Sequence, residues 1–325
     1  LYNDEPHYCD IVLKILLNAG NSSEITYDLF LIIILITLLI TYVKIVITWR
    51  KSAGVRSVST LFASQRLHAG DLVYAYLVGL IEGDGYFTVT KNGLYVKYEL
   101  GIEFSIRDVE LIYKIKKLLG VGIVSFRTKK DGTKLVSLRV RNKDHLKKFI
   151  VPIFDKYPLF SNKQYDYLFF RSCLFSDIIY YKDLPLYRRE LDPSLNTIDS
   201  ILNKSYFEAW LVGFIEAEGC FSIYNTKKDT ATYLAASFDI SQKNGEILIS
   251  AIRKHLSFTT KIIVDKTNCS RLKVSGIRSI SNIIKFLHKA PVKLQGNKKL
   301  QYLLWVKQLR KINRYSDKIN IPSNY

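Results

Sequence analysis

The sequence contains no methionine in 325 residues, and it begins with leucine. A complete translation product of this length without methionine would be unusual, so we expect part of a longer reading frame. The abundance of Ile, Leu, Lys, Asn and Tyr is typical of an AT-rich coding sequence, for which an organellar gene is one source. Cysteine is also scarce, and because no CxxC pair occurs, the sequence indicates neither a zinc site nor a disulfide framework. The four cysteines, which fit a reducing compartment, are Cys9, Cys173, Cys220 and Cys269.

Acidic residues are in deficit. The chain has 48 Lys and Arg against 29 Asp and Glu, which gives a formal net charge of +19. Residues 71–325 contain 42 of the basic and 24 of the acidic groups, so almost all of the excess lies there. A charge of this size favours a polyanionic partner. The length is sufficient for two domains of ordinary size.

Residues 1–70 differ in composition from the rest of the chain. No charged residue occurs between Leu29 and Val43, and the apolar run continues to Trp49 before the basic pair Arg50-Lys51. A stretch of about 20 apolar residues matches the thickness of a bilayer, so we expect a membrane segment at about 29–49. The alternative is a buried helix. Acidic residues before this segment argue against a transit peptide, and residues 52–70 are expected to form a linker.

An eleven-residue segment occurs twice, at Leu77–Phe87 and at Leu211–Phe221. Each copy is an apolar stretch that closes on an acid followed by glycine, Asp84-Gly85 in the first and Glu218-Gly219 in the second. If each copy is a helix, its C-terminal end is an unfavourable place for a carboxylate because of the helix dipole. An arrangement that compensates for this cost is therefore expected.

Small residues one helical turn apart would allow the two copies to pack closely. Gly79 and Gly83 occur in the first copy, and Gly213 and Ala217 occupy the equivalent positions in the second. Such packing would bring the two acids together, where like charges repel unless a cation lies between them. The repeat therefore predicts a paired-acid metal site on a pseudo-twofold axis. The alternative is two buried helices with glycine C-caps and acids that face solvent.

The residues after each motif follow the same pattern at an offset of 134 or 135. Alternating apolar residues predict a strand pair after each motif, and residues 108–119 and 246–256 have the spacing of helices. Further strands are expected at 121–126, 135–141, 261–265 and 271–275, and further helices at 143–154, 162–175, 279–287 and 297–309. We infer a tandem duplication with a first domain at 71–176, a linker at 177–205 and a second domain at 206–325.

The polar sides of the predicted strands carry basic and hydroxyl side chains that suit duplex DNA. Lys and Arg bind phosphate through counterion release, and mixed polar side chains read base edges in the major groove. For any one residue, a solvated strand face is the alternative. The predicted DNA-binding residues are Lys97, Arg127, Arg139, Arg141 and Lys273.

The two motifs, together with the order of elements after them, resemble the LAGLIDADG homing endonuclease family over residues 71–325. The resemblance implies an α+β fold in which tandem αββαββα domains, related by a pseudo-twofold axis, form a β-sheet DNA-binding saddle. It also implies a monomer that covers roughly 20 base pairs, about two helical turns of DNA. The implied activity is a double-strand break in DNA.

Carboxylate oxygens are hard donors that suit Mg²⁺, for which Mn²⁺ is expected to substitute. Asp84 and Glu218 are the expected ligands and catalytic acids. The resemblance further implies that Lys163 and Lys298 lie near the cleavage centre, and that Gln242 occupies a solvent pocket whose counterpart in the first half is Asp108. The sixth motif residues, Glu82 and Glu216, are expected to cap or to form salt bridges near the central helices.

Within the family, the sequence of residues 71–325 is similar to the sequences of enzymes encoded in group I introns of the fungal mitochondrial apocytochrome b gene. Phe160–Tyr167 and Ala290–Trp305 are among the stretches that carry this similarity. It implies a mitochondrial protein that cuts intronless DNA and also assists splicing of its own intron RNA. We expect a location in the matrix, with attachment to the inner membrane through the apolar segment at about 29–49 before processing. Two basic surfaces are candidates for the RNA, namely the linker pair Arg188-Arg189 and the C-terminal run Lys307–Arg314, in which Arg310, Lys311 and Arg314 are the residues to substitute.

Two other functions use the same fold. A non-cleaving RNA-binding splicing factor has no need for two repelling carboxylates, so the presence of both acids favours an enzyme. A DNA-binding regulator would more often carry an added helix-turn-helix module, and the sequence pattern does not indicate one.

Overall fold

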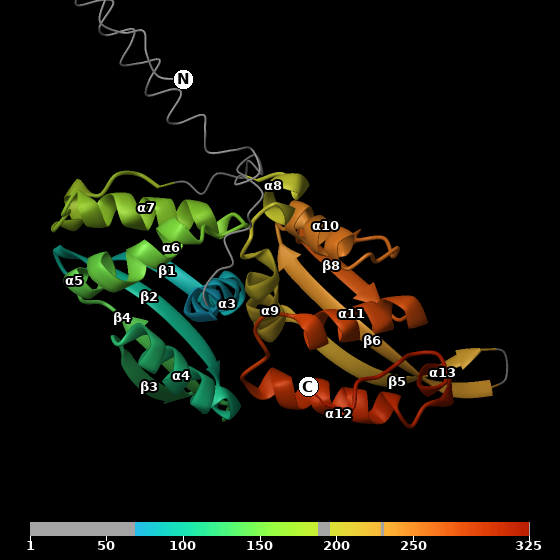
Figure 1. Cartoon of the computed structure of the whole chain (residues 1–325). Helices are drawn as coiled ribbons and strands as arrows, with labels where there is room; N and C mark the ends of the chain where they lie inside the picture. Colours follow the sequence, from blue (N-terminus) through green and yellow to red (C-terminus); the bar gives the residue numbers. More distant parts are fainter. Residues whose placement is uncertain (1–68, 188–195, 229–230, 325) are drawn as a thin grey trace, which may run out of the picture. The chain divides into compact units, whose positions relative to one another are not determined.

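The computed structural model describes residues 69–187, 196–228 and 231–324 (Figure 1). The predicted membrane segment at about 29–49 and the basic pair Arg188-Arg189 lie outside these residues. Within the described part of the chain, no helix is both long enough and apolar enough to span a bilayer.

The first repeat begins with the motif helix and continues through two strand pairs, each followed by helices (Figure 1). A single π-helical turn at Leu146–Ile150 joins two short helices into the continuous helical segment that the sequence predicted at 143–154. The elements are α3 (Ala69–Asp84), β1 (Gly85–Asn92), β2 (Tyr95–Ser105), α4 (Val109–Leu119), β3 (Ile123–Thr128), β4 (Lys134–Val140), α5 (Lys143–His145), α6 (Val151–Lys156) and α7 (Lys163–Phe175).

The second repeat has the same order of elements. A short helix, α8 (Ile198–Leu202), precedes it within the stretch that the sequence suggested as a linker. Its remaining elements are α9 (Phe207–Glu218), β5 (Cys220–Lys228), β6 (Ala231–Lys243), α10 (Glu246–His255), β7 (Ile263–Val264), β8 (Cys269–Val274), α11 (Ile277–Lys289), α12 (Asn297–Leu309) and α13 (Asn313–Ser316).

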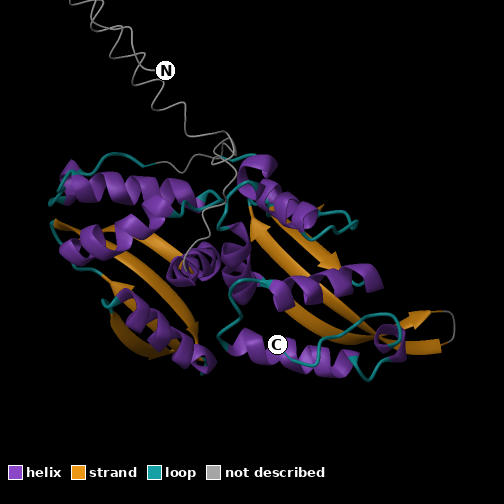
Figure 2. Cartoon of the chain, viewed as in Figure 1, coloured by secondary structure: helices purple, strands orange, loops and turns teal. Residues whose placement is uncertain are grey.

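Each repeat forms an antiparallel four-stranded sheet with helices packed against it (Figure 2). The strand orders are β1-β2-β4-β3 and β5-β6-β8-β7, so the two sheets have the same topology. The predicted α+β class is therefore confirmed. The strand expected at 121–126 begins two residues later, because Gly120 and Gly122 adopt positive φ angles and form the turn that precedes it.

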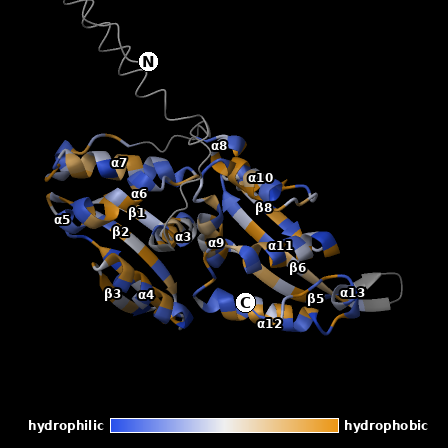
Figure 3. Ribbon diagram, viewed as in Figure 1, coloured by the Kyte–Doolittle hydropathy of each residue, from blue (hydrophilic) through white to orange (hydrophobic). Residues whose placement is uncertain are grey.

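Alternation along the strands separates an apolar face from a polar face, and the strands are banded accordingly in Figure 3. In the first sheet, Leu100 of β2 pairs with Val140 of β4, and both side chains are buried in the core. The opposite, polar face is not simply solvated, because Glu99 is only 5% exposed. Charged partners cover this carboxylate, as described below.

The two motif helices, α3 and α9, lie side by side between the sheets (Figure 1). At their crossing, a Cβ atom on Gly79 would lie 1.9 Å from the carbonyl oxygen of Trp210. A Cβ atom on Gly213 would lie equally close to the carbonyl oxygen of Tyr76. Only glycine permits this approach, so the predicted small-residue packing of the two motif helices is confirmed.

Candidate functional site

Asp84 and Glu218 are the last residues of α3 and α9, and the close packing of these helices brings their C-terminal ends together. A Cβ atom on Gly83 would lie 2.4 Å from Cβ of Ala217 and 3.4 Å from Oε1 of Glu218. The structure therefore places one carboxylate from each repeat at a shared centre, which we call the acid centre. Asp84 remains accessible to solvent, and Glu218 is partly accessible.

Both carboxyl groups have raised pKa values. Loss of hydration raises the pKa of Asp84, the charges of Lys163 and Lys298 lower it, and Asp108 raises it further. Loss of hydration also raises the pKa of Glu218, and the second cause is the negative charge of Asp84. The two groups therefore disfavour each other's ionised form. A cation between them would relieve this repulsion.

The donors at the acid centre fit a divalent metal such as Mg²⁺. Two carboxylates supply hard oxygen ligands, and Mg²⁺ usually takes its other positions from water and phosphate oxygens. In the part of the chain that the structure describes, no group of three or more His, Cys, Asp or Glu side chains forms a metal cage by itself. A metal here would therefore depend on Asp84 and Glu218 together with oxygens from solvent and substrate.

Lys163 lies at the end of α3. Its ammonium group donates hydrogen bonds to the carbonyl oxygens of Ile81, Gly83 and Gly85 at 2.9, 3.1 and 2.6 Å. These carbonyls belong to the last turn of the motif helix and to the residue after Asp84, so the lysine caps the negative end of the helix dipole. This contact partly offsets the cost of a carboxylate at that end.

The sixth motif residues hold the segments that carry the two lysines. Glu82 is fully buried and accepts backbone hydrogen bonds from Phe160 and Ser161 at 2.7 and 3.1 Å. In the second repeat, Glu216 accepts equivalent bonds from Gln295 and Gly296 at 2.7 and 3.1 Å. Burial raises the pKa of both acids. The structure shows the capping role that the sequence suggested, and each of these segments continues directly into α7 or α12, where Lys163 and Lys298 lie.

A contact between the repeats positions the second lysine. The backbone N–H of Asn297, at the start of α12, donates to Oδ1 of Asp108 at 2.6 Å. A cavity of about 300 Å³ lies beside this contact, and its walls include Asp84, Asp108 and Lys298. Gln242, the expected pocket residue, is not part of these walls. It pairs with Ser270 in the strand ladder.

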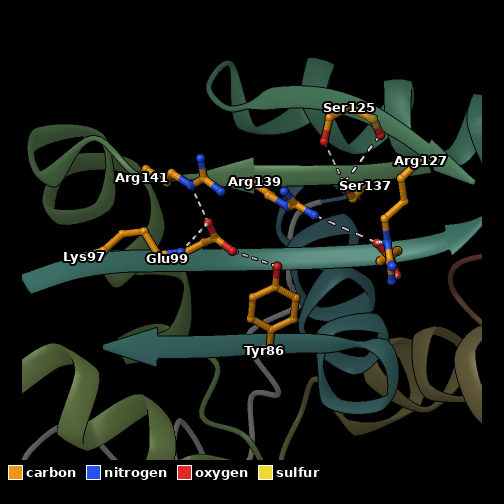
Figure 4. Close-up of polar contacts among 9 residues, drawn as sticks. Tyr86, Lys97, Glu99, Ser125, Arg127, Ser137, Arg139 and Arg141 are labelled. Carbon is orange, nitrogen blue, oxygen red and sulfur yellow. Dashed lines mark hydrogen bonds and ion pairs between the residues drawn. The ribbon is translucent and has the colours of Figure 1, made fainter. Parts of the chain in front are cut away.

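Two glutamates of β2 organise the polar face of the first sheet (Figure 4). Glu99 pairs with Arg141, accepts a hydrogen bond from Tyr86 at 2.8 Å, and lies 3.9 Å from the ammonium of Lys97. Burial opposes ionisation of Glu99, but the hydrogen bonds from Arg141 and Tyr86 outweigh it, so the pKa of Glu99 is below its ordinary value.

Glu103 binds the other two predicted cations on this face. Arg127 donates from Nε and Nη2 to its two carboxylate oxygens at 2.7 and 2.5 Å, and Arg139 lies 4.0 Å away. The hydrogen bonds from Arg127 are the main reason that the pKa of Glu103 is lowered. All four cations predicted for DNA contact in this sheet therefore lie on one face, each beside a carboxylate.

The second sheet contains one predicted cation and one pair that sequence reasoning missed. Lys273 lies over the ring of Tyr224, 5.0 Å from its centroid. Arg271 donates from Nε and Nη2 to the carboxylate of Asp239, and this bond raises the pKa of the arginine. Arg271 and Asp239 do not face each other directly across the strands, so their pairing could be found only from the register of β6 and β8.

The geometry of the repeated motif agrees with comparison to known proteins. The model of the LAGLIDADG endonuclease family matches residues 77–174 and 211–309, one match in each repeat. The chain belongs to the LAGLIDADG endonuclease family. Members of this family are DNA-cleaving nucleases, so the predicted family and enzyme class are confirmed.

Curated relatives are named as products of introns. The chain is 30% identical over 259 residues to a probable intron-encoded endonuclease, Cox1-I1b, of Schizosaccharomyces pombe, covering 73% of this chain and 64% of that protein. It is 30% identical over 236 residues to a probable intron-encoded endonuclease, aI3, of Dictyostelium citrinum, covering 70% and 91%. An intron-encoded RNA maturase, bI4, of Saccharomyces cerevisiae is 28% identical over 153 residues, covering 47% of this chain and 20% of that protein.

Solved structures show the same fold. The meganuclease I-SmaMI, solved with uncleaveable DNA, has a TM-score of 0.60 at 21% identity and covers 74% of this chain and 92% of its own. I-CpaMI, solved with uncleaved DNA, has a TM-score of 0.60 at 20% identity and covers 75% and 92%. These similarities confirm the predicted tandem LAGLIDADG fold.

Proposed function

We propose that this chain is a homing endonuclease that cuts both strands of a specific duplex DNA in the presence of Mg²⁺. The observation that carries the proposal is the meeting of Asp84 and Glu218 at the adjacent ends of α3 and α9. Each repeat contributes one carboxylate, which matches a reaction that must occur once on each strand. The intron-encoded names of the relatives support the same function.

Asp84 and Glu218 are the residues that would hold the metal. When bound, Mg²⁺ supplies charge neutralisation at the phosphate and a more acidic water. The residues of the chain provide what surrounds that chemistry. The positive charges of Lys163 and Lys298 partly balance the negative charge of Asp84 and Glu218.

The two lysines are proposed as catalytic residues that stabilise negative charge on the phosphate. Their positions differ in detail. Lys163 is bound to carbonyl groups at the end of α3, whereas Lys298 lines the cavity beside Asp84. Asp108 fixes the start of α12 and is proposed to orient Lys298 indirectly. Gln242 remains a proposed catalytic residue at a solvent pocket of the second repeat, although it does not line the cavity beside Asp84.

The polar faces of the sheets are proposed to bind the DNA. Lys97, Arg127, Arg139, Arg141 and Lys273 carry the positive charge for this contact. We propose that the protein acts as a monomer, because one chain supplies both repeats. The relatives named after cox1 introns and the maturase similarity favour a mitochondrial site of action. Attachment to a membrane through residues 29–49 is proposed only for a form that retains them.

The experiment is to incubate the full chain with a panel of intronless and intron-containing DNA. The panel includes apocytochrome b sequences, which the sequence resemblance favours, and cox1 sequences, which the relatives' names favour. A unique double-strand cut in intronless DNA with Mg²⁺ or Mn²⁺, and none with EDTA, is expected. Absence of cleavage across the panel, with the protein folded and bound to DNA, would contradict the proposal.

A second activity, assistance to splicing of a group I intron RNA, is favoured by the similarity to an RNA maturase. RNA lacks an accessible major groove, so the polar faces cannot read it as they read DNA. Within the candidate run at the C-terminus, two of the basic side chains already have partners in the protein. Arg310 is bound to the carbonyl of Pro322, and Arg314 lies over the rings of Tyr233 and Tyr315. Exposed Lys307 and Lys311 are therefore the better candidates there.

A further inference from the structure

Two arginines on the polar faces are held by carboxylates in the same way. Arg127 donates from Nε and Nη2 to Glu103 in the first sheet. Arg271 donates from Nε and Nη2 to Asp239 in the second. The first pair joins β2 and β3, which lie on either side of β4, and the second joins the neighbouring strands β6 and β8. Both pairs lie on the face that carries the predicted DNA-binding residues.

In both pairs the carboxylate is the more buried partner and the guanidinium is the more exposed one. The side chains of Glu103 and Asp239 are 23% and 10% exposed, whereas those of Arg127 and Arg271 are 53% and 58% exposed. A guanidinium has five N–H donors in a planar arrangement. The carboxylate takes the Nε and one Nη2 donor, so both Nη1 donors and one Nη2 donor remain on the outer edge.

That outer edge suits a guanine better than a phosphate. Two parallel donors match O6 and N7 of guanine in the major groove, which is the commonest specific contact between arginine and DNA. Phosphate binding gains most from an uncompensated positive charge, because counterion release depends on net charge neutralised. Glu103 and Asp239 cancel much of that charge, while they fix the plane of the guanidinium and reduce the entropy lost on binding.

We infer that Arg127 and Arg271 each read one guanine of the target, and that Glu103 and Asp239 are the positioning residues for these two contacts. The inference rests on the proposed function, since it names how the same DNA-binding faces obtain specificity. It assigns one guanine to the half-site of each sheet. Lys97 differs, because it is a point charge suited to phosphate.

The test is a selection of duplexes bound by the full chain from a library randomised over about two helical turns, in EDTA so that no cleavage occurs. The variants are Arg127→Lys, Arg271→Lys, Glu103→Gln and Asp239→Asn, and Lys97→Gln is the matched control. Lysine keeps the charge but cannot form the bidentate contact.

For the wild type we expect a fixed guanine in each half of the selected site. Each Arg→Lys variant should lose preference for one of these guanines by about tenfold or more, with preferences elsewhere unchanged. Glu103→Gln and Asp239→Asn should relax the same positions as their partner arginines. Lys97→Gln should instead weaken binding to all sequences alike and lower the salt dependence of affinity.

Two results would overturn the inference in distinguishable ways. One result is that the wild type selects a sequence but the Arg→Lys variants retain its preference for guanine, or bind all sequences more weakly to the same degree. The arginines then bind phosphate, and the inference fails while the proposed function stands. If the folded wild type selects no duplex sequence, the proposed function fails together with it.

Discussion

Gly79 packs directly against the backbone of Trp210, with 1.9 Å between the carbonyl oxygen of Trp210 and the position that a Cβ atom on Gly79 would take. Gly213 and Tyr76 have the same relationship on the other side of the crossing. These contacts set the distance between α3 and α9, and thereby the distance between the two acids at their ends. Stability and activity therefore depend on the same glycines.

Replacing Gly79 with alanine should destabilise the protein, because the added methyl group must displace backbone atoms of α9. The expected loss in free energy of unfolding is about 1–3 kcal/mol or more, measured by urea denaturation. Gly213→Ala should behave alike. Gly70→Ala is the matched control, since nothing lies within 4 Å of the added methyl group. There the helix should gain roughly 0.5–1 kcal/mol. Equal stability of the Gly79 and Gly70 variants would refute the packing argument.

Asp84→Asn and Glu218→Gln should each abolish double-strand cleavage while DNA binding persists. Either change removes one negative charge from the acid centre and leaves the polar faces of the sheets intact. Cleavage is followed on a linear duplex that carries the target, and binding by gel shift without metal. Glu110→Gln, an exposed acid on α4, serves as a control and should cut normally. Cleavage at the wild-type rate by either acid-centre variant would contradict the metal assignment.

Substitution of Lys163 should affect both the stability of the fold and the rate of cleavage, whereas substitution of Lys298 should affect only the rate. Lys163→Met removes three hydrogen bonds to the end of α3, so it should lower the free energy of unfolding by roughly 1–3 kcal/mol as well as slow cleavage. No hydrogen bond or ion pair of the Lys298 ammonium is found among the described residues. Lys298→Met should therefore slow cleavage by about 10²-fold with little change in stability. A Lys298 variant that loses stability and activity together would show a structural role instead.

Glu99 should contribute to the acid sensitivity of the fold. Its pKa in the folded protein is below the ordinary value of 4.5, so its ionised form stabilises the folded state above that pH. This contribution is lost as the pH falls through the lowered pKa. Glu99→Gln should therefore lose less stability than the wild type when urea denaturation is repeated from neutral pH down to about pH 3. Glu110→Gln is again the control and should follow the wild type. Parallel curves for the wild type and Glu99→Gln would exclude the effect.

The duplication and the motif helices could be predicted from the sequence because their signals are local and occur twice. The acid-glycine ending of each motif and the small residues one turn apart already indicated that Asp84 and Glu218 meet. The contacts that cross between strands or repeats could not be predicted. Asp108 binds the start of α12 across 189 residues of sequence, and no local pattern marks such a partner.

The polar face shows the same limit. The alternation along β2 and β4 predicted polar faces that carry Lys97, Arg139 and Arg141, but it gave no sign that Glu99 pairs with Lys97 and Arg141. Which cation each acid binds depends on the register of β2, β3 and β4, since a shift by one residue would place the acids on the core face. The pairing of Arg127 with Glu103 across an intervening strand could therefore be read only from the sheet.

The last prediction separates DNA cleavage from splicing. Lys307 lies in the last turn of α12, Lys311 lies two residues after its end, and both are exposed. If the protein binds intron RNA through this surface, Lys307→Gln combined with Lys311→Gln should reduce splicing activity, because each lysine contributes phosphate affinity. The same variant should cleave DNA normally, whereas Asp84→Asn should splice normally without cleaving. Both activities are measured on both variants. A parallel loss of cleavage and splicing in either variant would show that the two nucleic acids share one surface.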